Sequence, residues 1–183
     1  MYTLKELESI SKNCQRCDLS NTRTNVVFGG GNPEADIMFV GEGPGFHEDR
    51  LGEPFVGKSG QLFDKMLRAI ELKRDDVYIT NIIKCRPPNN RNPSKEESDT
   101  CIEYLRWQVA LIKPKLIVCL GAVASKNMIS KDFKITQQRG SWFQRGDYSM
   151  IGTYHPAALL RDPSKKGEAW EDFKMLKEKL ELL

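Results

Sequence analysis

The sequence predicts an α/β domain in which parallel strands form a central sheet and helices cover both of its faces. Four short apolar runs have the length and composition of buried strands, at residues 36–40, 77–83, 115–120 and 149–153. Segments with helical spacing separate these runs, and strands that alternate with helices pair in parallel. In such sheets ligands bind beyond the carboxyl ends of the strands, so functional residues are expected there.

Capping signals and apolar spacing mark the helices. Capping boxes at residues 3–6 and 94–97 each begin a helix. The first helix leads to Cys14, and the second carries apolar residues as far as Ile112. Further helices are expected at 61–72, at 122–129 and around 170–180.

Length and charge bound the class of protein. A chain of 183 residues is long enough for one domain with a substantial core. It has no membrane-spanning apolar run and no secretory leader pattern, so a cytoplasmic protein is expected. The net charge of +3 does not by itself argue for nucleic acid. Residues 84–95 nevertheless hold four cations and no acid, and 161–166 hold three cations and one acid, so these segments are either solvated loops or phosphate-binding loops.

Four of the five cysteines form a split metal-ligand pattern. Cys14 and Cys17 are a C-x2-C pair, whereas Cys85 follows a predicted strand and Cys101 lies in a predicted helix. Four convergent thiolates suit an iron–sulfur cluster or a tetrahedral zinc ion, and the spacing does not decide between them. Disulfides are the weaker alternative, because cytosolic thiols stay reduced. Cys119 lies in an apolar strand and is expected to be a core residue.

Glycine-rich or polar segments follow three predicted strands. Residues 41–45 (Gly-Glu-Gly-Pro-Gly) either expose main-chain N–H groups to a ligand or form a plain tight turn. Asn81 ends the second strand, where its amide is able to pair with the edge of a base. His155 follows the fourth strand and precedes a proline, whereas His47 is expected to be solvated in a polar loop.

Residues 54–60 hold two further candidates. Phe55 is either an ordinary core residue or a stacking platform. Residues 57–60 (Gly-Lys-Ser-Gly) precede a helix, and they either bind a phosphate at its N-terminus or form a flexible entry. No phosphate loop of Walker spacing is present.

Together these motifs resemble the iron–sulfur (family 4) uracil-DNA glycosylases. The resemblance covers nearly the whole chain and rests on the cysteine spacing and on residues 41–45, 48–49, 54–60, 80–81, 84–88, 120–122 and 154–158. It implies a [4Fe–4S] cluster rather than zinc, held by Cys14, Cys17, Cys85 and Cys101. It also implies a three-layer α/β/α fold with a four-stranded parallel sheet, in a single domain over residues 1–183. The implied reaction is hydrolysis of the N-glycosidic bond between uracil and DNA, which starts base-excision repair.

The resemblance also implies roles for the site residues. A base inside a duplex has to be flipped out before an enzyme reaches it. Phe55 then stacks on the uracil, Asn81 reads its O4 and N3–H edge, and Glu48 crowds the position of a thymine methyl group. His155 and the backbone N–H groups of Gly41 and Gly43 stabilise charge on the departing uracil.

The attacking water is expected at Glu42. Cluster-free glycosylases of the same superfamily carry a water-activating aspartate where Gly43 stands here, so Glu42 is the nearest carboxylate, and either its side chain or its backbone is expected to hold the water. No arginine-rich, histidine-containing insert lies between Asn81 and Cys101, which disfavours relatives that bond covalently to DNA.

The expected partner is uracil-containing DNA, single- or double-stranded. Leu160 is expected to fill the position in the base stack that the flipped uracil vacates. The other expected DNA contacts are basic or hydroxyl side chains: Lys58, Ser59, Arg86, Arg91 and Arg161. The cluster is expected to lie far from the base and to pin residues 84–95. A sliding clamp is a further candidate partner, and we expect a monomer associated with the nucleoid.

Two other classes of protein remain open. A non-catalytic iron–sulfur module would bind nucleic acid without needing Phe55, Asn81 and His155 at strand ends. A zinc-stapled nucleotide-binding enzyme would be expected to carry the phosphate-loop spacing that this chain lacks.

Overall fold

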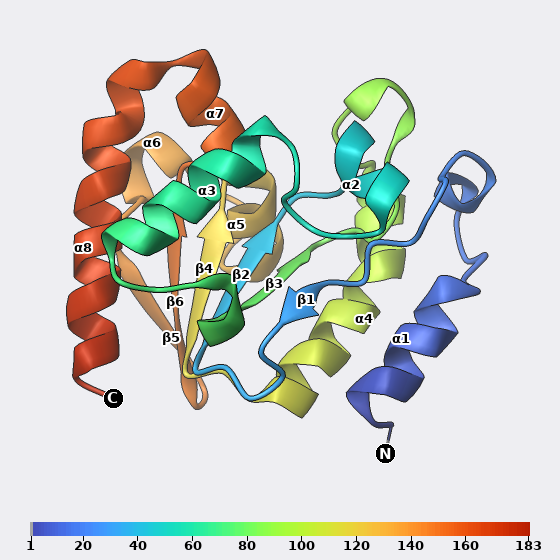
Figure 1. Cartoon of the computed structure of the whole chain (residues 1–183), viewed down its shortest axis with the longest axis horizontal. Helices are drawn as coiled ribbons and strands as arrows, with labels where there is room; N and C mark the ends of the chain where they lie inside the picture. The colour runs from blue at the N-terminus through green and yellow to red at the C-terminus, as the bar shows by residue number, and fades with distance from the viewer. Residues whose placement is uncertain (1) are drawn as a thin grey trace.

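The structure is a computed structural model and describes residues 2–183. Within these residues the chain forms a six-stranded sheet with helices on both sides (Figure 1). The order of the strands across the sheet is β1-β3-β2-β4-β6-β5. The strands are β1 (Gly30–Gly31), β2 (Ile37–Gly41), β3 (Tyr78–Asn81), β4 (Leu116–Leu120), β5 (Trp142–Arg145) and β6 (Tyr148–Thr153).

The four central strands are the predicted ones, and they run parallel in the order β3, β2, β4, β6. The edge strands β1 and β5 pair antiparallel with β3 and β6, and they were not predicted. The prediction of a four-stranded parallel sheet is thus correct for the centre and incomplete at the edges. β1 consists of two glycines and β5 has no buried residue, so neither has the apolar run that marks a buried strand.

Each central strand contributes to two cores, because successive side chains point to opposite faces of a sheet. Met38 and Val40 face a core shared with α4 (Lys95–Ile112) and α5 (Ala122–Met128). Ile37 and Phe39 face a second core shared with α3 (Lys58–Ala69) and α8 (Lys166–Glu181). These two helix layers confirm the α/β prediction.

The helix starts follow their capping signals. Thr3 caps α1 (Leu4–Lys12) and Ser94 caps α4, each through a complete capping box. α3 begins and ends three residues earlier than predicted, and the chain beyond it turns through Glu71, whose φ is +64°. Three short helices were not predicted: α2 (Phe46–Leu51), α6 (Ile135–Gln138) and α7 (Pro156–Arg161). His47, expected in a loop, is therefore in a helix, although it is exposed as expected.

The order of the strands places a ligand site near β2. The chain passes from β2 to β3 on one side and then to β4 on the other, so the loops after these strands diverge. Such a divergence opens a crevice at the carboxyl edge of a sheet. No helix in the described part of the chain is both long enough and apolar enough to cross a membrane.

Candidate functional site

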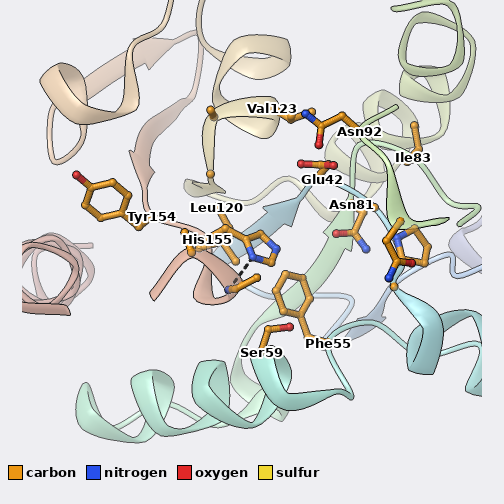
Figure 2. Close-up of a pocket in the computed structure, with 18 of the residues that line it drawn as sticks. Glu42, Phe55, Ser59, Asn81, Ile83, Asn92, Leu120, Val123, Tyr154 and His155 are labelled. Atoms are coloured by element: carbon orange, nitrogen blue, oxygen red, sulfur yellow. Dashed lines mark hydrogen bonds between the residues drawn. The ribbon is translucent and has the colours of Figure 1, made fainter. Parts of the chain in front are cut away.

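A pocket of about 570 Å³ opens beyond the carboxyl ends of the parallel strands (Figure 2). Each of the four strands contributes a lining residue: Glu42 after β2, Asn81 on β3, Leu120 on β4 and His155 after β6. The predicted residues Gly43, Glu48, Phe55, Ser59 and Arg161 also line this pocket. The structure thus brings together residues that lie more than a hundred positions apart in the chain.

Asn81 presents an unpaired acceptor to the pocket. The residue is 2% exposed, and Oδ1 is the one buried side-chain oxygen or nitrogen in the described residues without a hydrogen-bond partner. Leaving a buried polar atom unpaired costs about 1–3 kcal/mol, so an atom of this kind is expected to accept a hydrogen bond from water or from a ligand. A ligand N–H group in the pocket would satisfy it.

Phe55 and His155 form one wall. Their rings are stacked, with centroids 5.4 Å apart and planes inclined by 26°, and Phe55 also packs on Phe63 at 5.1 Å. The backbone of Phe55 has a φ of +52°, in the left-handed region that non-glycine residues seldom adopt. Such conformations persist where the surroundings impose them, often at ligand sites.

Hydrogen bonding and burial fix the charge and the tautomer of the His155 ring. Its Nδ1 accepts the N–H of Ala157 at 3.0 Å, the dashed line in Figure 2, which caps the start of α7. Burial lowers the pKa of His155 to about 4, and the positive charge of Arg161 adds to this effect. The ring is therefore neutral at physiological pH, and because Nδ1 is an acceptor, its proton resides on Nε2.

Glu42 is one of two carboxylates that line the pocket, and the other is Glu48. Burial raises the pKa of Glu42, while Arg161 opposes the shift. The neighbouring Gly43 has no room for a side chain, because a Cβ atom there would lie 2.6 Å from Cγ1 of Ile83. A side chain at position 43 would therefore displace Ile83, whereas the carboxylate at position 42 already lines the pocket.

Glu48 supports the pocket as well as lining it. Its Oε1 accepts N–H groups from Val56 and Gly57, both at 3.1 Å. Sequence reasoning expected Glu48 to crowd a methyl group on the base. What the structure shows is that its carboxylate holds the segment that follows Phe55, and the effect on a methyl group stays a prediction.

The four predicted metal-ligating residues, Cys14, Cys17, Cys85 and Cys101, line a second, smaller cavity. All four are free thiols, and two of the sulfurs accept N–H groups: Cys85 from Arg23 at 3.4 Å and Cys101 from Lys84 at 3.3 Å. In residues 2–183, no three His, Cys, Asp or Glu side chains are arranged to hold a metal ion. Cys119 is a buried core residue in β4, as predicted, and burial raises its pKa to about 12.

Lys84 corrects the prediction of a solvent-facing basic segment at residues 84–95. It is 1% exposed, and its ammonium group donates to Thr80 Oγ1 at 2.5 Å, to the Asn81 carbonyl oxygen at 2.8 Å and to Gln108 Oε1 at 2.7 Å. Burial lowers its pKa to about 7. Nothing in the local sequence indicated this, since the acceptor on Gln108 comes from a distant helix.

Arg91 is also less free than its segment suggested. It donates two hydrogen bonds to the carboxylate of Glu97, at 2.9 and 2.7 Å, and this pairing is the main reason that the pKa of Glu97 falls to about 2. Arg86 lies over the ring of Phe46, with 5.3 Å between the guanidinium carbon and the ring centroid. Glu97 lies two residues beyond the acid-free segment, so counting charges within 84–95 overestimated its positive potential.

Of the other predicted DNA contacts, Ser59 and Arg161 line the pocket, and Lys58 and Leu160 are their neighbours in the chain. Lys58, Leu160 and Arg161 are exposed, and Ser59 is half-buried. Leu160 is 44% exposed, whereas its neighbour Leu159 is a core residue at 1%, so only the former is available as a wedge.

Comparison with known proteins identifies the class. Residues 28–174 match the family model described as "Uracil DNA glycosylase superfamily". Type-4 uracil-DNA glycosylases are similar along nearly their whole length. The one from Archaeoglobus fulgidus is 44% identical over 97% of this chain and 94% of its own, and the one from Thermotoga maritima is 46% identical over 91% and 90%. A third, from Sulfurisphaera tokodaii, is 44% identical over 97% of this chain and 85% of its own.

The chain belongs to the type-4 uracil-DNA glycosylases. Membership confirms the resemblance noted in the sequence and the class of enzyme, a DNA glycosylase that hydrolyses N-glycosyl bonds. It sets aside the two alternatives, a non-catalytic binding module and a zinc-stapled nucleotide-binding enzyme.

Proposed function

We propose that this protein, acting as one domain over residues 1–183, flips uracil out of DNA into the pocket and hydrolyses its N-glycosidic bond. The observation that carries the proposal is the unpaired Oδ1 of Asn81. Uracil offers an N3–H donor beside its O4 acceptor, so Oδ1 accepts from N3 while the Nδ2 amide donates to O4. With the amide in this orientation, cytosine presents an acceptor at N3 and leaves Oδ1 unpaired, which discriminates against it.

Phe55 stacks on the base, and His155 assists its departure. As the glycosidic bond breaks, its electron pair moves onto uracil and negative charge develops at O2. The neutral imidazole donates from Nε2 to that oxygen, consistent with the pKa of about 4. N–H groups of Gly41 and Gly43 assist. A donor of this kind is worth about 3 kcal/mol when charge develops in the transition state.

Glu42 holds the attacking water through its side chain. The backbone carbonyls of Gly41 and Glu42 already accept N–H groups from Ile82 at 2.9 Å and Ile83 at 3.1 Å. The Glu42 carboxylate is therefore the freer acceptor. Water attacks C1′ of the sugar as uracil leaves, and its proton passes to this carboxylate. Glu48 closes the pocket toward a methyl group at C5 of the base.

The four cysteines suit a [4Fe–4S] cluster, which membership in the type-4 family supports. Their sulfurs come from three separate segments and line one cavity away from the base pocket. A cluster there would cross-link the N-terminal segment, the loop after β3 and helix α4, which is a structural contribution. No step of the hydrolysis requires it.

DNA contacts complete the proposal. Lys58, Ser59, Arg86, Arg91 and Arg161 bind phosphates, and Leu160 enters the stack that uracil vacates. The monomeric state, recruitment by a sliding clamp and location at the nucleoid stay predictions.

The test is release of free uracil from a single-uracil oligonucleotide under single-turnover conditions. Wild type releases uracil, whereas Asn81→Ala and Asn81→Asp lose most of this activity. Cytosine-containing DNA is the matched substrate. Asn81→Asp is expected to show at most a trace of activity on it, and that trace would arise because the second carboxylate acceptor suits the N4 amine. Near-normal uracil excision by Asn81→Ala would refute the proposed reading of the base.

A further inference from the structure

Arg74 lies outside the pocket, and its guanidinium group grips the backbone of the segment that carries Phe55. Nη1 donates to the carbonyl oxygen of Pro54 at 2.9 Å, and Nη2 donates to the carbonyl oxygen of Phe55. Nε donates to Oδ1 of Asp64 at 2.7 Å. Three of the five N–H groups of this side chain thus have partners, and two of those partners are consecutive backbone carbonyls.

The backbone to which Arg74 donates includes Phe55, the residue with the left-handed conformation. Phe55, with its φ of +52°, holds a conformation that an L-residue keeps only when the surroundings impose it. Gly60, in the first turn of α3, is part of those surroundings, because a Cβ atom there would lie 1.9 Å from the Phe55 carbonyl oxygen. Absence of a side chain at position 60 therefore lets the Phe55 carbonyl approach the helix.

Opposite charges hold the two ends of this segment. Arg74 takes the carbonyls of Pro54 and Phe55, and the Glu48 carboxylate takes the N–H groups that follow, at Val56 and Gly57. The two charged groups come from different elements: Glu48 is in α2, and Arg74 begins the short turn at residues Arg74–Asp76 that precedes β3. The segment is thereby tied to both neighbouring parts of the fold.

We propose that Arg74 is a positioning residue of this glycosylase, which fixes the left-handed turn at Phe55 and so orients the ring that stacks on uracil. The inference rests on the proposed stacking role of Phe55. Arginine suits the task because its rigid planar fork serves two adjacent carbonyls while its third donor is held by a carboxylate. A lysine ammonium is a single point and cannot reproduce this geometry.

A double-mutant cycle with Phe55→Ala tests the proposal. The measured quantities are the single-turnover rate of uracil excision and the dissociation constant of free uracil. Arg74→Met is expected to lower the rate by about 10²-fold, the effect typical of a group misplaced by about 1 Å, and to weaken uracil binding. Arg74→Lys recovers part of both. In the Phe55→Ala background, Arg74→Met has little further effect, since no ring remains to be positioned.

Lys177→Met is the matched control. It removes a salt bridge to Glu71 in which Lys177 is 34% exposed, against 32% for Arg74, and it touches no part of the pocket. Asp64→Asn provides a milder perturbation should Arg74→Met fold poorly, since it loosens the guanidinium group without removing it. Circular dichroism and thermal unfolding verify that each variant is folded.

Two results would overturn the inference. One is wild-type excision and uracil binding in Arg74→Met. The other is an equal loss with and without the Phe55 ring, which would assign Arg74 to general stability. A Phe55→Ala variant with normal excision and uracil binding is a separate result: it would remove the stacking role itself, and the role of Arg74 with it.

Discussion

A methyl group on Gly41 would lie 2.4 Å from Oδ1 of Asn81 and 2.8 Å from Cζ of Phe55. Gly41 and Asn81 are the last residues of β2 and β3, and they are register partners in the ladder between these two strands. The bare backbone at position 41 therefore sets how closely the base-reading amide and the stacking ring approach each other. A substitution there tests pocket geometry without removing any functional group.

Gly41→Ala is expected to displace the Asn81 amide and the Phe55 ring together. Because small misplacements of positioned groups are costly, single-turnover excision should fall by about 10²-fold or more. Gly30→Ala is the matched control, since a Cβ atom at position 30 meets nothing within 4 Å. Activity in Gly41→Ala close to that of Gly30→Ala would show that the pocket tolerates a wider separation of the strands.

His155→Ala should slow the chemical step more than it weakens binding. Loss of one donor to a developing anion typically costs about 10²–10³-fold in rate, while affinity for uracil-containing DNA should change little. His47→Ala removes the other histidine, which is exposed on α2, and should behave like wild type. Loss of DNA affinity with an intact chemical step would instead make His155 a docking group.

The pH dependence of excision should report Glu42. Burial raises its pKa above the usual 4.5, so the ionised form that holds water is lost as pH falls through a midpoint above that value. Glu42→Gln should be slow and should lose this acidic limb. Arg161→Met should move the limb to higher pH, because the arginine charge lowers the pKa of Glu42.

Arg161 also lowers the pKa of His155, which is about 4, so the same substitution raises both values. Single-turnover rates between pH 4 and 8 measure the shift, with a DNA concentration that saturates each variant. An acidic limb that stays in place in Arg161→Met would mean that another group titrates.

Much of this architecture could be predicted because it depends on local signals. β2 and β4 are buried on both faces and stand out as continuous apolar runs, and capping boxes mark the starts of α1 and α4. Asn81 and His155 could be singled out as polar residues at predicted strand ends. The edge strands could not, since β1 is only two glycines.

The residues that support the pocket were missed for a different reason. Arg74 and Lys84 read as ordinary surface cations, and only the folded chain brings the Pro54 carbonyl and the Gln108 side chain to them. The grip of Glu48 on residues 56 and 57 depends equally on tertiary structure. A positive φ at Phe55 carries no signal in the sequence, because the residue is not a glycine.

Replacement of any one of Cys14, Cys17, Cys85 or Cys101 by Ala should abolish the visible absorption of anaerobically purified protein and lower its melting temperature. Metal bound to thiolates in the folded state stabilises that state, so its loss destabilises the chain. Cys119→Ala is the control, and should keep the colour because Cys119 is buried in β4. Stoichiometric zinc without iron in the wild type would refute the cluster.

Arg86 and Arg91 should contribute unequally to DNA binding. Removing a cation that binds one phosphate reduces the slope of log K against log salt by about 1. Arg86→Gln should approach this value, whereas Arg91→Gln should fall short of it, because Arg91 is already paired with Glu97 through two hydrogen bonds. Lys5→Gln, on the exposed face of α1, controls for net charge. Binding titrations between about 50 and 200 mM salt, where phosphate binding dominates affinity, measure the slopes. Unchanged slopes in both arginine variants, with the fold intact, would show that these two side chains are solvated and do not bind phosphates.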